Sequence, residues 1–392
     1  MDGQHVSPEE GHGQANVPLR DRVAHFTWAN FVCTQSTGGI AILLSVTPYQ
    51  FHGLQTIGVV VFIFNIVLFL LFCAAISTRF ILHPYTIRRS FIIPPESYFF
   101  GSFLLSIATF IICMQRFGVM HTGPWLVVVI RVLFWIYAAV SLLFSTSVWV
   151  LLGAKSSAKI KPLQPPIFLI VFNAMLTGTV AGAIAPSQPP SERLAIIVAG
   201  IAYQGLGWVL ALLLLGWYLG SLVERGPGPP NTRLGLFIPV GSSGYTIVAL
   251  IGCARNVPQG YGYFASHPNA AEIVQVVALW ASIFLWLVSF WIFAVALIAC
   301  LPLLWPFQSG RFQPRMAFTL SWWSIIFPNV GFTIATAYIG EELESPAIQW
   351  VATAMAILLV LFWLMDLTLH LRAMFTGQIM YPGKDEDAVK SK

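Results

Sequence analysis

Long apolar segments constrain the fold of this chain more than any other feature of its sequence. A helix needs roughly 20 mostly apolar residues to cross a bilayer, and of the 392 residues 57% are hydrophobic and only 9% charged. Ten segments meet this requirement, at 26–47, 56–80, 97–117, 124–152, 165–185, 193–222, 233–255, 271–302, 315–340 and 346–373. The sequence therefore predicts an all-α polytopic protein of a lipid bilayer, with ten transmembrane helices.

The basic residues predict how these helices are oriented. If the N-terminus is cytosolic, 16 of the 20 Lys and Arg residues fall on the cytosolic side. Only Arg116, Arg193 and Arg255 fall on the outer side, and Arg131 lies within the fourth span. Basic residues favour cytosolic loops, so both termini are expected in the cytosol. The net charge of +5 then reflects membrane orientation, and no nucleic-acid partner is expected.

The chain divides into a transmembrane domain and two tails. Residues 1–24 and 374–392 are poor in apolar residues and are expected to be disordered cytosolic tails; residues 1–24 contain no secretory signal. Residues 25–373 form the ten-helix domain. The five cysteines lie in or at the ends of apolar segments, without a CxxC pair, and are expected to be packing residues. No metal or cofactor is expected.

The ten spans alternate between two compositions. Among the central eleven residues, Gly, Ser, Thr, Asn, Gln and Pro make up 25 of 55 in the odd-numbered spans and 7 of 55 in the even-numbered ones. A hydroxyl or broken backbone turn is tolerated at membrane depth only inside protein or along a wet cavity. The odd helices are therefore predicted to line a central path, and the even helices to face lipid. Close helix packing by small residues is the alternative, favoured for the sixth span.

The ninth span carries a proline at its centre. Pro328 lacks an N–H and its ring crowds the carbonyl of Ser324, which predicts a kink or break midway along this helix. A broken helix offers backbone N–H groups to anions without a charged side chain. A kink that serves packing alone is the alternative.

The path is expected to conduct anions. No Asp, Glu, Lys, Arg or His occupies the middle of an odd span, whereas ion coupling usually relies on such a group. Weak, multiple donors suit rapid flux. The predicted substrate-binding residues are Ser36, Thr37, Gly38, Ser106, Thr109, Asn173, Thr177, Ser242, Ser243 and Asn329.

Three arginines could concentrate anions at the outer mouth. Arg116 and Arg255 lie at the outer ends of the third and seventh spans, where snorkelling to lipid headgroups is the alternative role. Arg131 lies about 10 Å inside the outer end of the fourth span, at about 1.5 Å per residue, and is predicted to have a protein partner or a function. Asp366 is expected nearer the cytosolic face, beside His370 or Arg372.

Phe327 and Phe332 flank the break predicted in the ninth helix. A bulky ring in a polar path can block it and swing aside, so both are candidate gates; packing is the alternative.

Several motifs together resemble one family. These are "HFTWANFVCTQSTGGIAI" (25–42), "YQGLGW" (203–208), "IFPNVGF" (326–332) and "YPGKDEDA" (381–388). They resemble the fungal malic acid transport proteins, which are plasma-membrane C4-dicarboxylate carriers of the tellurite-resistance/dicarboxylate transporter family, related to plant slow anion channels. The likeness covers about residues 20–388.

The resemblance implies a fold, a gate and substrates. It implies five helical hairpins around a pseudo-five-fold axis, odd helices lining the pore, and often a homotrimer. In this family a Phe followed by Pro plugs the pore, which corresponds to Phe327 and Pro328, with Phe332 in reserve. The implied substrates are malate, succinate and fumarate, moved by potential-driven uniport. The family also contains sulfite exporters and chloride or nitrate channels.

Alternative functions remain open at this point. They are a proton-coupled carrier of monoanionic malate, a sulfite or inorganic anion efflux channel, and a closed structural or receptor bundle. An enzyme is not expected: Gly241–Gly244 fits the GxSG pattern of intramembrane serine proteases, but every histidine lies in a tail, a loop or near a span end.

Overall fold

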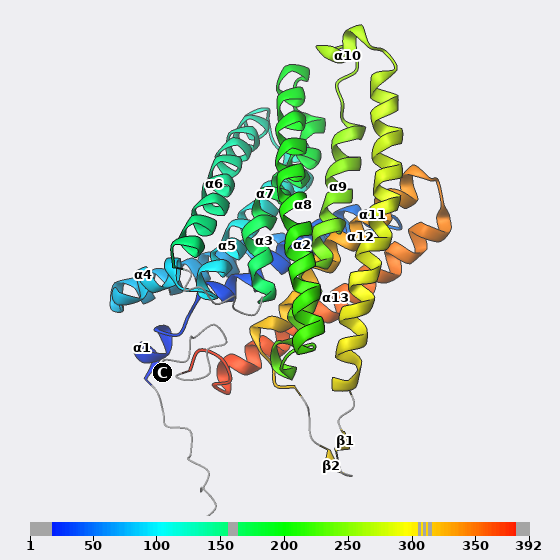
Figure 1. Ribbon diagram of the computed structural model, residues 1–392. Helices are drawn as coiled ribbons and strands as arrows, with labels where there is room; N and C mark the ends of the chain where they lie inside the picture. Colours follow the sequence, from blue (N-terminus) through cyan, green and yellow to red (C-terminus); the bar gives the residue numbers. More distant parts are fainter. Residues whose placement is uncertain (1–17, 156–163, 305–306, 309–310, 313–315, 382–392) are drawn as a thin grey trace, which may run out of the picture.

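The structure is a computed structural model that describes residues 18–155, 164–304, 307–308, 311–312 and 316–381 (Figure 1). Its helices are α1 (Leu19–Val23), α2 (Phe31–Val46), α3 (Leu54–Leu82), α4 (Tyr85–Ile92), α5 (Glu96–Cys113), α6 (Trp125–Lys155), α7 (Phe168–Ile184), α8 (Pro190–Arg225), α9 (Val240–Arg255), α10 (Tyr263–Ser266), α11 (Ala270–Cys300), α12 (Ile326–Glu342) and α13 (Pro346–Phe375). Two short strands, β1 (Phe307–Gln308) and β2 (Arg311–Phe312), pair antiparallel. The described chain is thus an all-α membrane fold with one small hairpin.

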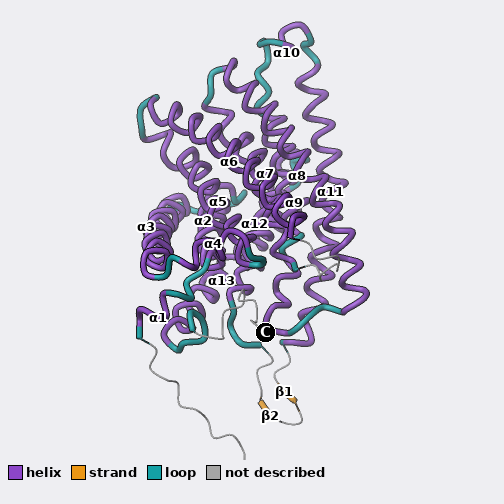
Figure 2. Tube along the Cα trace, turned by 60° about the vertical axis from the view of Figure 1, so that its left-hand side comes forward, coloured by secondary structure: helices purple, strands orange, loops and turns teal. Residues whose placement is uncertain are grey.

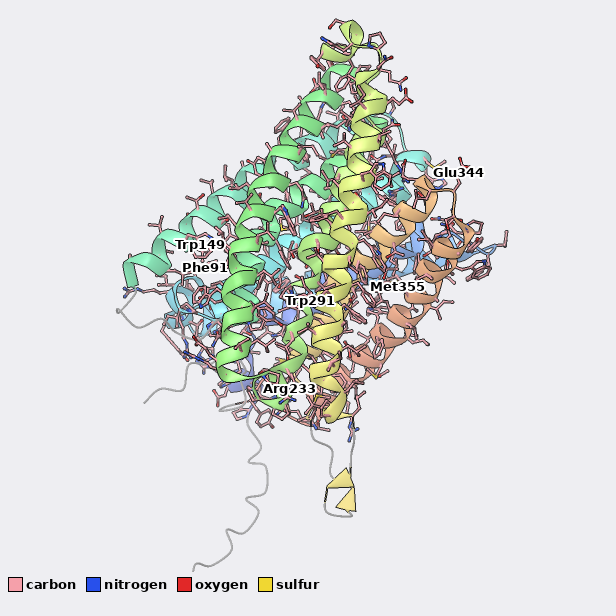
Figure 3. The ribbon with its side chains drawn as sticks, turned by 45° about the vertical axis from the view of Figure 1, so that its right-hand side comes forward. Phe91, Trp149, Arg233, Trp291, Glu344 and Met355 are labelled. Carbon is pink, nitrogen blue, oxygen red and sulfur yellow. The ribbon has the colours of Figure 1, made fainter. Side chains whose placement is uncertain are left out.

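Five helices form a closed inner ring. Each of α2, α5, α7, α9 and α12 packs against the next, and α12 packs back against α2. These helices contain the odd-numbered spans of the sequence. The even-numbered spans are α3, α6, α8, α11 and α13, and each packs on the outside against the inner helix of its own hairpin. Figure 3 shows side chains projecting from this outer layer, with Trp291 labelled on α11.

Burial separates the two layers. In the inner spans of α2, α5, α7 and α9, between 67% and 94% of the most apolar window is buried, against 22% to 33% in the five outer spans. Every residue of α12 from Ile326 to Gly340 is buried as well. The predicted alternation of inner and outer helices is confirmed. Small and hydroxyl-bearing side chains are common in the inner ring because each of its five helices packs against a neighbouring inner helix on either side.

The ninth predicted span begins with a 3₁₀ helix, as the seventh does at Pro230–Phe237, but it is not among the described helices that meet the criteria for a membrane span. In the described residues, nine helices are long and apolar enough to cross a membrane. The segment predicted at 315–340 is instead a 3₁₀ helix, Leu320–Ile325, followed by the 17-residue α12. The break predicted midway, at Pro328, is therefore wrong in position: the change of helix type occurs at Ile325–Ile326, and Pro328 lies in the first turn of α12. Proline is tolerated there because a first-turn N–H has no partner within the helix.

The two ends of the bundle differ. Figures 1 and 2 show α1 and the β1–β2 hairpin at one end and α10 at the other; we call these the α1 end and the α10 end. Arg22 of α1 donates a hydrogen bond to the carbonyl of Met374 near the end of α13, with an N–O distance of 2.6 Å. The chain therefore enters and leaves the bundle on the same side. Part of the tail predicted at 1–24 forms α1, whereas residues 1–17 and 382–392 of the predicted tails lie outside the described residues.

Glycines allow the inner helices to approach closely. A Cβ atom on Gly244 of α9 would lie 2.7 Å from the backbone nitrogen of Phe332 in α12. A Cβ atom on Gly182 of α7 would lie 3.0 Å from the carbonyl carbon of Gly252 in α9. Real Cβ atoms do not come as close to backbone as 2.7 Å, so the position of Gly244 requires glycine. At Gly182 a Cβ atom would force the backbone of α9 to shift by a few tenths of an ångström. The predicted close packing of the sixth span holds at Gly207, which faces Met175, but not at Gly205, which is exposed.

Candidate functional site

Three cavities follow one another inside the inner ring. The vestibule, at the α10 end, is wide and open to solvent, and it includes Arg116, Arg255 and Tyr338. The middle cavity is narrow, with room for about one water molecule, and it shares Arg116, Gly182, Gly252 and Tyr338 with the vestibule. The inner cavity, nearer the α1 end, is too tight to hold a water molecule. Shared wall residues make the three cavities successive parts of one path.

Phe327 stands between the middle and inner cavities. It lines both, together with Leu176 and Tyr245, and only 2% of its surface is exposed. The rings of Phe327 and Tyr245 stack with a centroid distance of 4.9 Å, and the Tyr245 hydroxyl donates to the Phe327 carbonyl at 3.0 Å. On the other side, a Cβ on Gly39 would lie 3.2 Å from the Phe327 ring. The ring thus fills the path where α9 and α2 come closest to it.

Arg116 presents an uncompensated positive charge to the path. It lies in a π-helical turn, Met114–Gly118, which continues α5; such turns are frequent at functional sites. Its guanidinium donates to the Tyr338 hydroxyl at 3.0 Å, and its Nε atom has no hydrogen-bond partner. Among the described residues, no carboxylate lies within ion-pair distance of Arg116. Its remaining donors are available to an anion.

Arg255 is near Arg116 but is neutralised. Its guanidinium pairs with Glu341 at 2.8 Å and also with Glu342, both at the end of α12. It lies 4.6 Å above the Tyr338 ring centroid and donates to the Tyr338 carbonyl at 3.2 Å. Arg255 therefore holds the rim of the vestibule together. Its predicted role in substrate binding is not supported by this geometry, although it lines the vestibule.

Arg131 lies away from the path. Its guanidinium pairs with Glu192, on α8, at 3.6 Å, and the two side chains are 23% and 43% exposed. The protein partner expected from the sequence is present, and it joins two outer helices. Arg131 lines none of the three cavities, so its predicted role in substrate binding has no support from this geometry.

Most of the predicted hydroxyl and amide ligands are committed to helix packing. Thr109 alone of the ten lines one of the three cavities. The others have partners within or between helices: Ser36 to Trp323, Thr37 to Cys33 and Trp363, Ser106 to Thr34, Asn173 to Leu169 and Tyr137, Thr177 to Asn173, Ser242 to Pro239, Ser243 to Ser289 and Asn329 to Ile325. Gly38 packs against Thr109 and Asn65. Their assignment as wall residues is corrected accordingly.

Phe332 is not placed to act as a gate. Its ring faces α11, with centroid distances of 5.4 Å to Trp286 and 6.2 Å to Phe293. It lines none of the three cavities. Phe332 and Phe327 are five residues apart, which places them on different faces of α12. Of the two phenylalanines predicted as gates, Phe327 is therefore the one that lines the path.

Two tyrosines on the path were not predicted. Tyr245 lies directly after the Gly241–Gly244 stretch, and Tyr338 lies two turns after Gly331. In the sequence, each of these tyrosines is a polar aromatic residue among the small residues of an inner helix, and this contrast could have identified them. In the described residues, neither serine of Gly241–Gly244 bonds to a histidine, and no cluster of three metal-ligating side chains occurs.

The ring of inner helices and its path define a multi-pass membrane protein that transports anions. Residues 25–371 match the family model described as a voltage-dependent anion channel, SLAC1, and the chain belongs to this family. It is 34% identical to the malic acid transport protein of Schizosaccharomyces pombe, over 95% of this chain and 84% of that protein. It is 28% identical to the sulfite efflux pump SSU1 of Trichophyton rubrum, over 88% and 89% of the two chains. The family and these relatives are channels and transporters, not enzymes.

Proposed function

We propose that this protein carries C4-dicarboxylate anions such as malate, succinate and fumarate by channel-like, potential-driven uniport through the three cavities, with Phe327 as the gate. The observation that carries the proposal is Arg116, a guanidinium to which the described residues offer no carboxylate partner, on the wall shared by the vestibule and the middle cavity. A carboxylate is the complementary group for a guanidinium. The similarity to malic acid transport proteins supports the choice of dicarboxylates.

Apart from Arg116, the residues that line the middle cavity are suited to let an anion pass and not to bind it tightly. The polar groups of the middle cavity are Thr109, Thr179, Tyr245 and Tyr338 besides Arg116, and the rest of its wall is apolar or glycine. The hydroxyls of Thr109, Thr179 and Tyr245 already donate to backbone carbonyls. The Tyr338 hydroxyl accepts from Arg116 and keeps its own O–H for an anion, and such a neutral donor attracts an anion weakly enough for it to leave. One carboxylate of a C4 acid can meet Arg116 while the other is held by the Tyr338 hydroxyl or water.

The direction of flux follows from the orientation in the membrane. We place the protein in the plasma membrane with both termini, and so the α1 end, in the cytosol, as the distribution of basic residues favours. An inside-negative potential contributes about 2.3 kcal/mol per charge per 100 mV, so it drives a dianion outward. A homotrimer is the assembly that we expect.

Flux measurements in liposomes test this function. The full-length protein is reconstituted, a potassium diffusion potential is imposed, and labelled malate is followed with and without pH and sodium gradients. Uniport predicts that the potential alone sets the direction and that succinate and fumarate compete. Strict dependence on a proton or sodium gradient at matched monoanion concentration contradicts uniport.

Sulfite transport is the second candidate because relatives named sulfite efflux pumps match 88% of the chain. In the same liposomes, sulfite flux that malate does not inhibit favours this alternative. Inhibition of labelled malate flux by succinate and fumarate, and not by sulfite, favours dicarboxylates.

A further inference from the structure

Asp366 is a buried carboxyl group without a bonding partner. It lies on α13, 1% of its surface is exposed, and neither of its oxygens has a hydrogen-bond partner among the described residues. It lies nine residues before the end of α13, about 13 Å at roughly 1.5 Å per residue, so it is at membrane depth. An ionisable group placed there is costly and is a functional candidate by default.

The buried face of α13 around Asp366 is bonded to two parts of the inner ring. One turn before it, the Trp363 indole donates to the Thr37 hydroxyl of α2 at 3.1 Å. One turn after it, His370 Nδ1 accepts a hydrogen bond from the Trp323 indole at 3.0 Å. Trp323 belongs to the 3₁₀ helix Leu320–Ile325, which ends two residues before Phe327. Asp366 thus lies between the two bonds that fasten α13 to α2 and to the segment carrying the gate.

The groups facing Asp366 do not supply a positive charge. From α2, Cys33 is close enough to interact with it electrostatically. On α13 itself, His370 accepts the indole N–H at Nδ1, so this nitrogen carries no proton and the ring is neutral while the bond is kept. Arg372 is exposed on a different face of the helix.

Two arginines on elements farther along the α1 end are engaged elsewhere. On α3, Arg79 is bonded to Glu96; Cys73 is the other titratable group on that half of the helix. On α1, Arg22 donates to the Met374 carbonyl. The 3₁₀ helix and the first half of α12, residues 320–332, contain no titratable side chain. Within the described part of the chain, a charged carboxylate at Asp366 has no counter-ion.

We infer that Asp366 is a proton-binding site that couples to the gate: the carboxyl group is protonated while α13 is seated against α2 and Trp323. When the O–H bond breaks, the proton passes to water at the α1 end and leaves a carboxylate that must be hydrated. Hydration separates α13 from α2 and Trp323, and the segment that carries Phe327 loses its support. Raising the pH at the α1 end therefore opens the path. This coupling rests on the proposed function, because its readout is anion flux past Phe327.

The flux experiment uses fumarate across the pH range in which it stays a dianion, so that the substrate does not titrate. The wild-type protein is expected to conduct more as the pH at the α1 end rises. Asp366→Asn, which mimics the protonated group, is expected to conduct at the wild-type low-pH level at every pH. Adding Phe327→Ala to Asp366→Asn should restore flux, which shows that the variant is folded. Glu192→Gln, at the peripheral Arg131 pair, should keep the wild-type pH dependence.

Infrared spectroscopy of the wild-type protein tests the site without transport. A protonated carboxylic acid in apolar surroundings gives a C=O stretching band, which should be present at low pH, disappear on titration and be missing in Asp366→Asn. Absence of this band, or a wild-type pH profile of fumarate flux in Asp366→Asn, overturns the inference. If the wild-type protein carries no dicarboxylate at any pH, the proposed function fails, and the infrared band still decides whether Asp366 binds a proton.

Discussion

Arg116 and Arg255 are two arginines of the same vestibule with different consequences for an anion. Arg255 is satisfied by Glu341 and Glu342, whereas the bond that Arg116 makes among the described residues is to the neutral Tyr338 hydroxyl. A hydrogen bond to a charged group is worth about 1.5–3 kcal/mol, or roughly tenfold to a hundredfold in affinity. We therefore expect Arg116→Gln to raise the malate concentration for half-maximal flux by about this factor, measured from initial rates in liposomes.

Arg131→Gln is the matched control for Arg116→Gln. It removes the same charge from a site outside the cavities, paired with Glu192 on the surface, where such pairs contribute about 0–1 kcal/mol. The half-maximal concentration should stay at the wild-type value. An equal rise in both variants would mean that the arginines act through the overall field of the protein and not through contact at Arg116.

Phe327 and Phe332 give a second matched pair. Phe327→Ala removes the ring between the middle and inner cavities, so we expect anion flux without a stimulus to rise severalfold. Phe332→Ala leaves the path intact but removes a ring packed on Trp286 and Phe293, which costs about 3–5 kcal/mol of folding free energy. Flux and melting temperature of each variant separate the two effects; a leak in Phe332→Ala and not in Phe327→Ala would reverse the assignment.

The sequence predicted which helices are inner but not which of their polar groups face the path. A Ser or Thr in a helix can satisfy its hydroxyl on the carbonyl three or four residues back, as Thr37 and Ser242 do. Composition cannot tell such a self-bonded hydroxyl from one that is free for a ligand. Arg116 was identified because a basic residue at the outer end of a span is rare in this chain. Tyr245 and Tyr338 were missed because aromatic residues are common throughout the spans.

The contact between α9 and α12 shows how closely two inner helices depend on glycine. Gly244→Ala would push a Cβ to 2.7 Å from the Phe332 backbone nitrogen, and backbone cannot rotate away as a side chain can. Overpacking of this kind costs about 1–3 kcal/mol, so we expect a lower melting temperature in detergent. Because the same contact positions the start of α12, the resting leak past Phe327 should also increase.

Gly205→Ala is the control for Gly244→Ala. Gly205 lies on the exposed face of α8, and a Cβ there would meet nothing within 4 Å. Alanine in a helix interior is favoured over glycine by roughly 0.5–1 kcal/mol, so this variant should melt at or slightly above the wild-type temperature. Destabilisation as large as in Gly244→Ala would show that loss of glycine itself, and not the α9–α12 contact, is responsible.

Element boundaries followed the sequence except where local chemistry changed the helix type. The predicted spans at 56–80 and 346–373 lie within α3 and α13, because uniform apolar composition leaves no competing conformation. The segment before α12 was taken as helix because it is apolar. Its 3₁₀ form depends on tertiary contacts, such as the Trp323 indole on His370 and the Ser36 hydroxyl on the Trp323 carbonyl, which no local pattern reveals.

Considered as a whole, the bundle is tied together at the α1 end by a buried ion pair. Arg79 of α3 bonds Glu96 of α5 at 2.5 Å and the Phe26 carbonyl at 3.1 Å, and Ser90 of α4 donates to the same carboxylate. Removing one member leaves the other buried and unpaired, at a cost of about 3–5 kcal/mol. Glu96→Gln should therefore markedly lower the melting temperature. Glu224→Gln, at an exposed pair with Arg225, should not.

Arg22 and Met374 lie close together, so the first and last hairpins are neighbours in the closed ring. The same ring can therefore be formed by a chain that starts at any of the five hairpins. A linker between the two ends, with new termini opened at the turn around Gly228, would begin the polypeptide at the fourth hairpin and end it at the third. Such a circular permutant should still complete the same five-membered circle, since the turn it opens lies on the side where the natural ends already meet.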